Sequence, residues 1–161
     1  MSELDVALTR QLELQEELHA LLKRETQELT EVHVDAMAEI NVLKNDISLR
    51  IADHGPILKQ AIQEIAAREG LAPDATLGDL NVRLSKKGNR DITRLYAELN
   101  VTADQIKELL SLNYAIAERF AASIGNSLEL IARIINQNST YGASGTYQQR
   151  PTSAVLINRE A

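Results

Sequence analysis

Cysteine is absent from this 161-residue sequence, and glycine and proline are scarce, at seven and three residues. Without cysteine, the chain can form no disulfide, zinc–thiolate site or thiolate nucleophile. A β-sandwich or β-barrel needs many tight turns, which so few glycines and prolines cannot supply. Aromatic residues make up only 3%, with no tryptophan and Phe120 as the single phenylalanine. These absences predict an all-α protein whose helix contacts are made by Leu, Ile, Val and Ala.

Excess positive charge is also missing, because the formal net charge is −6. Nucleic-acid binding needs a basic stripe that displaces the counterions of the phosphates. The one local basic cluster consists of Arg83, Lys86, Lys87, Arg90 and Arg94. No aromatic residue alternates with these charges, so a solvated loop is favoured over a phosphate site. We therefore predict no nucleic-acid partner.

The chain start lacks the basic and apolar regions of a signal peptide. No apolar run approaches the roughly 20 residues of a membrane-spanning helix. We expect a cytoplasmic protein that does not insert into a membrane.

Apolar residues recur every three or four positions in three long segments, at about 2–30, 34–69 and 91–138, which predicts three long amphipathic helices. Ser2 and Asp5 form a plausible N-terminal cap for the first. Gly55-Pro56 interrupts the second, but its apolar stripe keeps the same phase on both sides. We interpret the segment as one kinked helix, with a true turn as the alternative.

The third long segment carries the longest apolar stripe. Its predicted core positions are Ile92, Leu95, Leu99, Ile106, Leu109, Ile116, Phe120, Ile124, Leu128, Ile131 and Ile135. An aspartate at position 124 would then place an unpaired charge in the core and strongly destabilise the bundle. The Thr102–Gln105 sequence resembles a capping box, so a helix break at residues 100–102 is an alternative. Asn113 falls within the stripe, as a device that fixes helix register or as a hydrogen-bond partner for a bound protein; we favour register.

A connector at about residues 71–90 separates the second and third long helices. Thr76 and Asp79 could cap a short helix that ends near Ser85. From Ser139 the sequence becomes polar and loses its period, apart from a short apolar run at Val155-Leu156-Ile157. We predict an elongated antiparallel bundle of three long helices over residues 1–138 and a flexible C-terminal tail over residues 139–161.

Catalytic constellations are not apparent in the sequence. Glu16 and His19 form one Glu-x-x-His step, whereas a di-iron bundle site needs two such steps and further carboxylates. His33 and His54 have no glutamate three residues before them. No Gly-Lys-Ser/Thr phosphate loop occurs. We expect no enzymatic activity, no metal and no nucleotide.

The order of these segments resembles the FlgN family of flagellar export chaperones over nearly the whole chain. Two stretches of the third helix are similar to that family, Leu110-Ser111-Leu112-Asn113 and Ser127-Leu128-Glu129-Leu130-Ile131. The most specific match is the tail sequence Thr140-Tyr141-Gly142-Ala143-Ser144-Gly145, although some members have Asp where this chain has Gly142. The resemblance implies a cytosolic chaperone of flagellar type III export. Its clients would be hook-associated proteins of the hook–filament junction, bound through their C-terminal helices and escorted to the export apparatus.

The resemblance also suggests which residues bind partners. Tyr141 would dock on the export apparatus, or else would cover the helix end near Ile135, and Gly142 and Gly145 would let the backbone turn there. The expected client contacts are Phe120, Ile124, Leu128, Ile131, Ile135, Val155, Leu156 and Ile157. The alternative is a structural coiled-coil adaptor or self-assembling bundle, such as a homodimer, which would use the same stripes.

Overall fold

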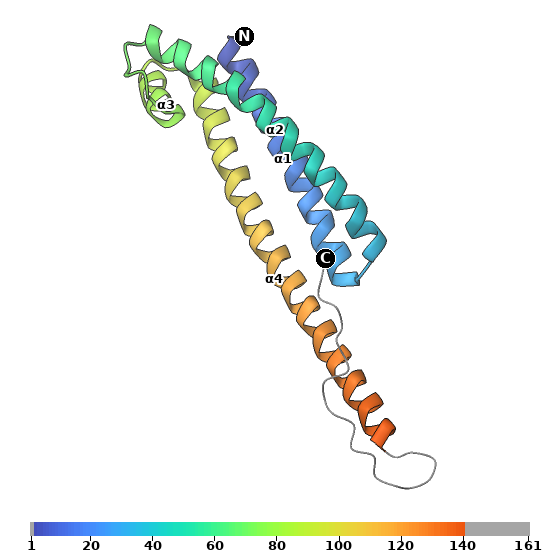
Figure 1. Ribbon diagram of the computed structural model, residues 1–161. Coiled ribbons are helices and arrows are strands. Elements are labelled where there is room, and N and C mark those ends of the chain that lie inside the picture. Colours follow the sequence, from blue (N-terminus) through green and yellow to red (C-terminus); the bar gives the residue numbers. More distant parts are fainter. Residues whose placement is uncertain (1, 141–161) are drawn as a thin grey trace. The chain divides into compact units, whose positions relative to one another are not determined.

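The computed structural model describes the backbone of residues 2–140 and the side chains of residues 2–135. Within that range it contains four helices and no strand, which confirms the predicted all-α class (Figure 1). The helices are α1 (Glu3–Glu31), α2 (Val34–Arg68), α3 (Leu77–Lys86) and α4 (Arg90–Thr140). Residues Met1–Ala117 form one compact unit, and a second unit begins at Glu118. The predicted tail lies outside the described residues, except for the backbone of Ser139 and Thr140, the last residues of α4.

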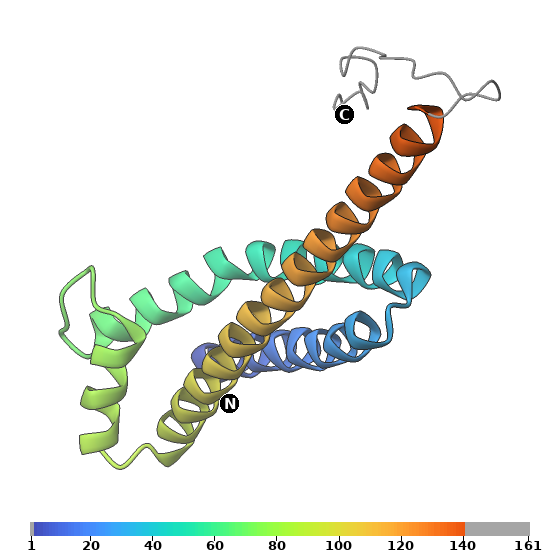
Figure 2. The ribbon, with the colours of Figure 1, turned by 90° about the horizontal axis from the view of Figure 1, so that it is seen from below.

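Helices α1 and α2 form an antiparallel hairpin and lie side by side (Figure 2). The turn between them is tight: Val32 has a left-handed φ of 59°, and the N–H of His33 donates to the carbonyl of Glu28 at 3.0 Å. Across the hairpin, the guanidinium of Arg50 makes two parallel hydrogen bonds to the carboxylate of Glu17, at 2.7 and 2.8 Å. Such a bidentate ion pair constrains the orientation of one helix relative to the other more tightly than a single hydrogen bond does.

The main core lies where α1, α3 and the start of α4 meet the second half of α2. Its buried residues are Leu4, Ala7, Leu8, Ala61, Leu80, Leu84, Ile92, Leu95 and Leu99. Helix α3 contributes Leu80 and Leu84 to this core, and it begins after the N-cap Thr76, as the sequence predicts. The Thr76 hydroxyl accepts from the backbone N–H of Asp79, and the Asp79 carboxylate accepts from the backbone N–H of Thr76. This capping box sets the phase of α3 so that Leu80 and Leu84, four residues apart, share the buried face.

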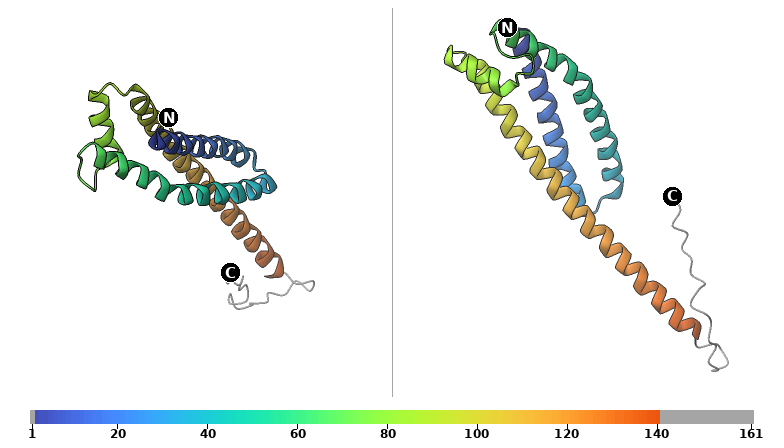
Figure 3. Two further views of the ribbon diagram at one scale, coloured as in Figure 1. Left: turned by 90° about the horizontal axis from the view of Figure 1, so that it is seen from above. Right: turned by 60° about the vertical axis from the view of Figure 1, so that its left-hand side comes forward.

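Helix α2 passes through Gly55-Pro56 without a break, so the one-helix interpretation is confirmed and the turn alternative is wrong. The helix curves along its length (Figure 3). Proline removes only one backbone donor, and the apolar stripe on both sides of it still faces the core. Next to the proline, His54 is buried, and its Nε2 lies 2.8 Å from the carbonyl oxygen of Ala7 in α1. Burial against the neighbouring helix holds this part of α2 in place.

Helix α4 is also continuous, so the break considered at residues 100–102 is not present. Thr102 is buried inside the helix and does not cap one. A Thr-x-x-Gln sequence indicates a helix start only where the preceding chain leaves the helix, and here Asn100 and Val101 remain helical.

Within Met1–Ala117, α4 runs alongside α1 in the same direction. Ile92 packs in one cluster with Leu4, and Asn113 lies further along, hydrogen-bonded to Leu22. The hairpin partner α2 therefore runs opposite to both. This arrangement describes α4 only as far as Ala117, and the antiparallel bundle over residues 1–138 stays a prediction.

Replacing Glu17 with glutamine should lower the free energy of unfolding by about 0.5 kcal/mol at pH 7, because an exposed ion pair is screened by water. The hydrogen bond from Arg50 holds the pKa of Glu17 below its ordinary value of 4.5. The stabilisation is therefore complete above that value, and it is lost as the pH falls through the depressed pKa. Urea denaturation at neutral and acidic pH should show the gap between wild type and Glu17→Gln closing on the acidic side. Glu16→Gln, at an exposed position without an ion pair in the described range, is the control.

Candidate functional site

One face of α4 continues in phase along the described helix, because residues three and four apart lie on the same side. In the first half, this face is buried and includes Ile92, Leu95, Leu99, Thr102, Ile106 and Asn113. The same spacing then continues through Phe120, Ile124, Leu128, Ile131 and Ile135. We call these last five residues the distal α4 face.

The distal α4 face is largely exposed. Ile124 is 46% exposed, Leu128 54%, Ile131 51% and Ile135 61%, whereas Phe120 is half-buried. The prediction that these residues belong to the core is therefore wrong for the four aliphatic ones. The sequence pattern identified the apolar face of the helix, but among the described residues that face stays exposed from Ile124 to Ile135.

The reach of α1 explains where burial stops. Thr26 of α1 meets Asn113 of α4, and α1 ends five residues later at Glu31. Five residues advance a helix by about 7.5 Å, the same rise that takes α4 from Asn113 to Glu118. Within Met1–Ala117, α1 therefore has only about one more turn beyond its contact with Asn113.

The distal α4 face is broad and carries no charge. Leu130 and Ile134, beside it, are also exposed, at 59% and 49%. The only charged residues between 121 and 135 are Glu129 and Arg133, which pair with each other at 2.6 Å. At 100° per residue they lie about 140–180° around the helix from Ile124. An apolar helix could thus cover the face without burying a charge, and exposed apolar surface of this kind is typical of a protein-binding site.

Asn113 is buried and fully occupied by contacts inside the protein. Its side-chain amide donates to the carbonyl of Leu22 at 3.0 Å and to the carboxylate of Glu25 at 2.8 Å. Its oxygen accepts from the hydroxyl of Thr26 at 2.6 Å. Glu25 is itself buried and also pairs with Lys44 of α2. These bonds link three helices at one level, which supports the register interpretation rather than contact with a client.

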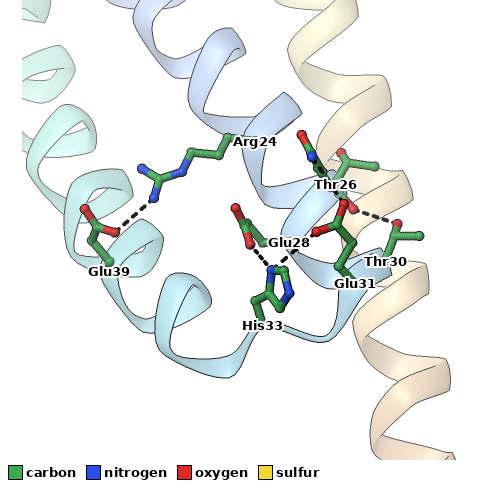
Figure 4. Close-up of polar contacts among 8 residues, drawn as sticks. Arg24, Thr26, Glu28, Thr30, Glu31, His33 and Glu39 are labelled. Carbon is green, nitrogen blue, oxygen red and sulfur yellow. Dashed lines mark hydrogen bonds and ion pairs between the residues drawn. The ribbon is translucent and has the colours of Figure 1, made fainter.

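The α1–α2 turn gathers a cluster that the sequence pattern did not indicate. Glu28, Glu31 and His33 each offer a potential metal-ligand atom, and these atoms lie within 4.8 Å of one another (Figure 4). His33 Nδ1 lies 2.7 Å from a carboxylate oxygen of Glu28 and 3.4 Å from one of Glu31. Glu28 and Glu31 lie three residues apart on one face of α1, and the left-handed turn at Val32 brings His33 to them. The three groups hold one another across the turn, and that pairing accounts for their arrangement.

Three residues of the basic cluster, Arg83, Lys87 and Arg94, form ion pairs within the protein. Lys87 Nζ lies 2.5 Å and Arg83 Nε 3.6 Å from the carboxylate of Glu69, at the end of α2. The hydrogen bond from Lys87 lowers the pKa of Glu69. Arg94 pairs with Glu98 one turn along α4. Ion pairs that join α3 to α2 or lie along one helix explain these three charges structurally.

A groove of about 430 Å³ lies between the first turns of α1 and the second half of α2. Ala7 and Ala61 line it together with Val6 and Ile57, which are 51% and 60% exposed. His54 lines it as well. The small alanine side chains leave this space between the two helices.

The predicted tail contacts lie outside the described residues. They are Tyr141, Gly142, Gly145, Val155, Leu156 and Ile157. Their roles stay predictions, including the two alternatives for Tyr141, which are docking on the export apparatus and cover of the helix end near Ile135.

The chain can be compared with known proteins by its helix order and by the long α4, whose apolar face is only partly buried. A family model with the description FlgN protein matches residues 1–149. The chain belongs to the FlgN family. Neither the curated proteins nor the solved structures contain a match to it. The resemblance to the FlgN family is therefore confirmed over residues 1–149.

FlgN proteins are flagellar export chaperones that bind flagellar proteins, and theirs is not an enzyme family. Membership thus gives this chain a chaperone role in flagellum assembly. None of the described helices is long and apolar enough to cross a membrane.

Asn113→Ala should destabilise the FlgN chain by about 1–3 kcal/mol, because it leaves the buried Glu25 with one partner fewer. Asn126→Ala, at an exposed position further along α4, is the matched control and should change stability by no more than about 0.5 kcal/mol. Urea unfolding followed by circular dichroism measures both. Equal stability of the two variants would contradict the structural role of the Asn113 network.

Ile124→Asp should change stability by less than about 1 kcal/mol, because the side chain is already in contact with water. Ile106→Asp, on the same helix face but only 9% exposed, should destabilise the protein by several kcal/mol, on the order of the cost of burying a charge. Thermal melts of the two variants would show the contrast. A large loss of stability in Ile124→Asp would mean that the distal α4 face is covered in the free protein.

Proposed function

We propose that this FlgN-family chain binds the C-terminal helical segments of hook-associated proteins on its distal α4 face. By covering those segments, it would prevent premature assembly before export. The observation that carries the proposal is the continuous apolar face of α4, buried up to Asn113 and exposed from Ile124 to Ile135. Proteins that polymerise through amphipathic terminal helices expose similar stripes while monomeric. A helix laid along the distal α4 face would bury both stripes at once.

The chemistry of the distal α4 face suits a helix in particular. Ile124, Leu128, Ile131 and Ile135 repeat with steps of four, three and four residues, the spacing of a coiled-coil seam. Glycine, serine or alanine occupies the neighbouring positions 125, 127 and 132, which allows close approach of a second backbone. A client helix with its own apolar residues at this spacing could interdigitate with them.

The tail has a separate place in the proposal. Tyr141, with Gly142 and Gly145, would dock the chaperone on cytoplasmic components of the flagellar export apparatus, and the protein would act in the cytoplasm. Val155, Leu156 and Ile157 would add apolar contacts to the bound client. The family match supports the docking role of Tyr141, since it extends to residue 149 and includes the Tyr141 motif, whereas Val155, Leu156 and Ile157 lie beyond the matched residues.

Self-association is the second candidate, because the same uncharged face could pair with a second copy. A homodimer or coiled-coil adaptor would bury the distal α4 face in the free protein. The mass of the free protein, measured by light scattering, separates this candidate from a chaperone that is monomeric until it meets its client.

The test uses Leu128→Asp/Ile131→Asp and a peptide that spans the C-terminal helices of a hook-associated protein. Calorimetric titration should show at least about a tenfold loss of affinity, because a charge would be buried at each position. The melting temperature should stay near that of the wild type, since both residues are more than half exposed.

Glu129→Ala/Arg133→Ala, on the opposite side of α4, is the matched control and should retain wild-type affinity. If the aspartate variant bound the peptide like the wild type, the client site would lie elsewhere. Tyr141→Ala should retain peptide affinity and lose binding to the export apparatus.

A further inference from the structure

The unit that begins at Glu118 has two concentrations of aliphatic residues. One is the distal α4 face. The other is Ala154-Val155-Leu156-Ile157, the only run of consecutive aliphatic residues between position 141 and the end of the sequence. The intervening residues are mostly glycine, serine, threonine, glutamine and tyrosine. An exposed apolar face and a short apolar segment are thus carried by the same part of the chain.

We propose that, when no client is bound, Val155, Leu156 and Ile157 dock on the distal α4 face of the same molecule. The occupant of the face is then this chain's own C-terminal segment. Docking removes apolar surface from water on both partners, which is the general driving force for such contacts. The contact itself needs nothing beyond this chain.

The length of the connection favours this contact. Val155 follows Thr140, the last helical residue of α4, by fifteen positions. Fifteen residues can span at most about 50 Å. Ile131 and Ile124 precede Thr140 by nine and sixteen helical residues, or roughly 14 and 24 Å at 1.5 Å per residue. The connection is therefore long enough to bring the apolar segment back to the distal α4 face.

The charges on α4 favour it as well. Between residues 121 and 135 the only charges are Glu129 and Arg133, and they pair with each other away from the distal α4 face. Val155, Leu156 and Ile157 would therefore cover the face without desolvating a charge. Arg159 and Glu160, the charges that follow the apolar run, could remain in solvent because they lie beyond it in sequence.

The consequence for client binding rests on the proposed function. A docked segment competes with the client helix for the same face. If the segment occupied the face about 80% of the time, the apparent client affinity would fall about fivefold. The client would have to displace the segment in order to bind.

The absence of cysteine permits a clean test in the full-length protein. A single cysteine in place of Ala161 carries a nitroxide spin label, and methyl NMR reports broadening of the signals of Leu128, Ile131 and Ile135. The proposal expects broadening that is largely lost in Val155→Ser/Leu156→Ser/Ile157→Ser. The matched control, Gln148→Ser/Gln149→Ser/Arg150→Ser, keeps chain length and should keep the broadening. Equal broadening in the two triple variants would overturn the proposal.

Mixing spin-labelled protein that lacks isotope with isotope-labelled protein that lacks the spin label distinguishes contact within one molecule from contact between two. Broadening in the mixture as strong as in the singly prepared protein would overturn the intramolecular proposal in favour of a self-associated form.

A titration with the hook-associated protein peptide separates this inference from the proposed function. The serine triple variant should bind the peptide about fivefold more tightly than the polar control variant if the segment competes. Tail-dependent broadening without any peptide binding would retain the docking contact and reject the client proposal. Peptide binding on the distal α4 face without tail-dependent broadening would do the reverse.

Discussion

Helix α4 is longer than the two helices of the α1–α2 hairpin, and this difference limits how much of its apolar face the hairpin can bury. Helix α4 has 51 residues, whereas α1 has 29 and α2 has 35. An apolar face that stays in phase along all of α4 can be buried only as far as the hairpin reaches. The first half of that face stabilises the fold. The second half, from Ile124 to Ile135, is exposed and is the surface that we propose for the client.

The Asn113 network determines where this division falls. Leu22, Glu25 and Thr26 on α1 receive or donate the hydrogen bonds of Asn113, and Lys44 on α2 pairs with Glu25. A shift of α4 by one turn would leave several buried polar groups without partners, which is costly in a low-dielectric interior. The network thus fixes the register of α4 against α1 within Met1–Ala117. Leucine at this position would pack in several registers and would fix none.

Membership of the FlgN family gives this geometry its biological sense. An export chaperone must recognise an apolar client segment, hold it reversibly and release it. An apolar face on one half of a helix could do so without disturbing the core, because the buried residues of the α4 face, such as Ile92 and Ile106, precede the exposed ones, such as Leu128. Apolar surface left open in water also favours contacts with any apolar segment nearby. A C-terminal segment of the same chain that occupies the face would limit such contacts and would yield to a longer client helix.

Features that depend on residues three or four positions apart could be predicted from the amino-acid sequence. The Ser2–Asp5 and Thr76–Asp79 caps were predictable because each is a contact within one turn. The continuity of α2 through Pro56 followed from the unbroken phase of its stripe. What packs against each apolar helix face depends on how the helices are arranged. Periodicity identifies the apolar face of a helix but not the element that covers it. Ile106 and Ile124 have the same pattern, yet one is buried and the other is not. The contacts of His54 with Ala7 and of Asn113 with Leu22 join residues 47 and 91 positions apart, and the His33 cluster needs the left-handed turn at Val32. Such contacts are set by how the helices pack, which no local pattern records.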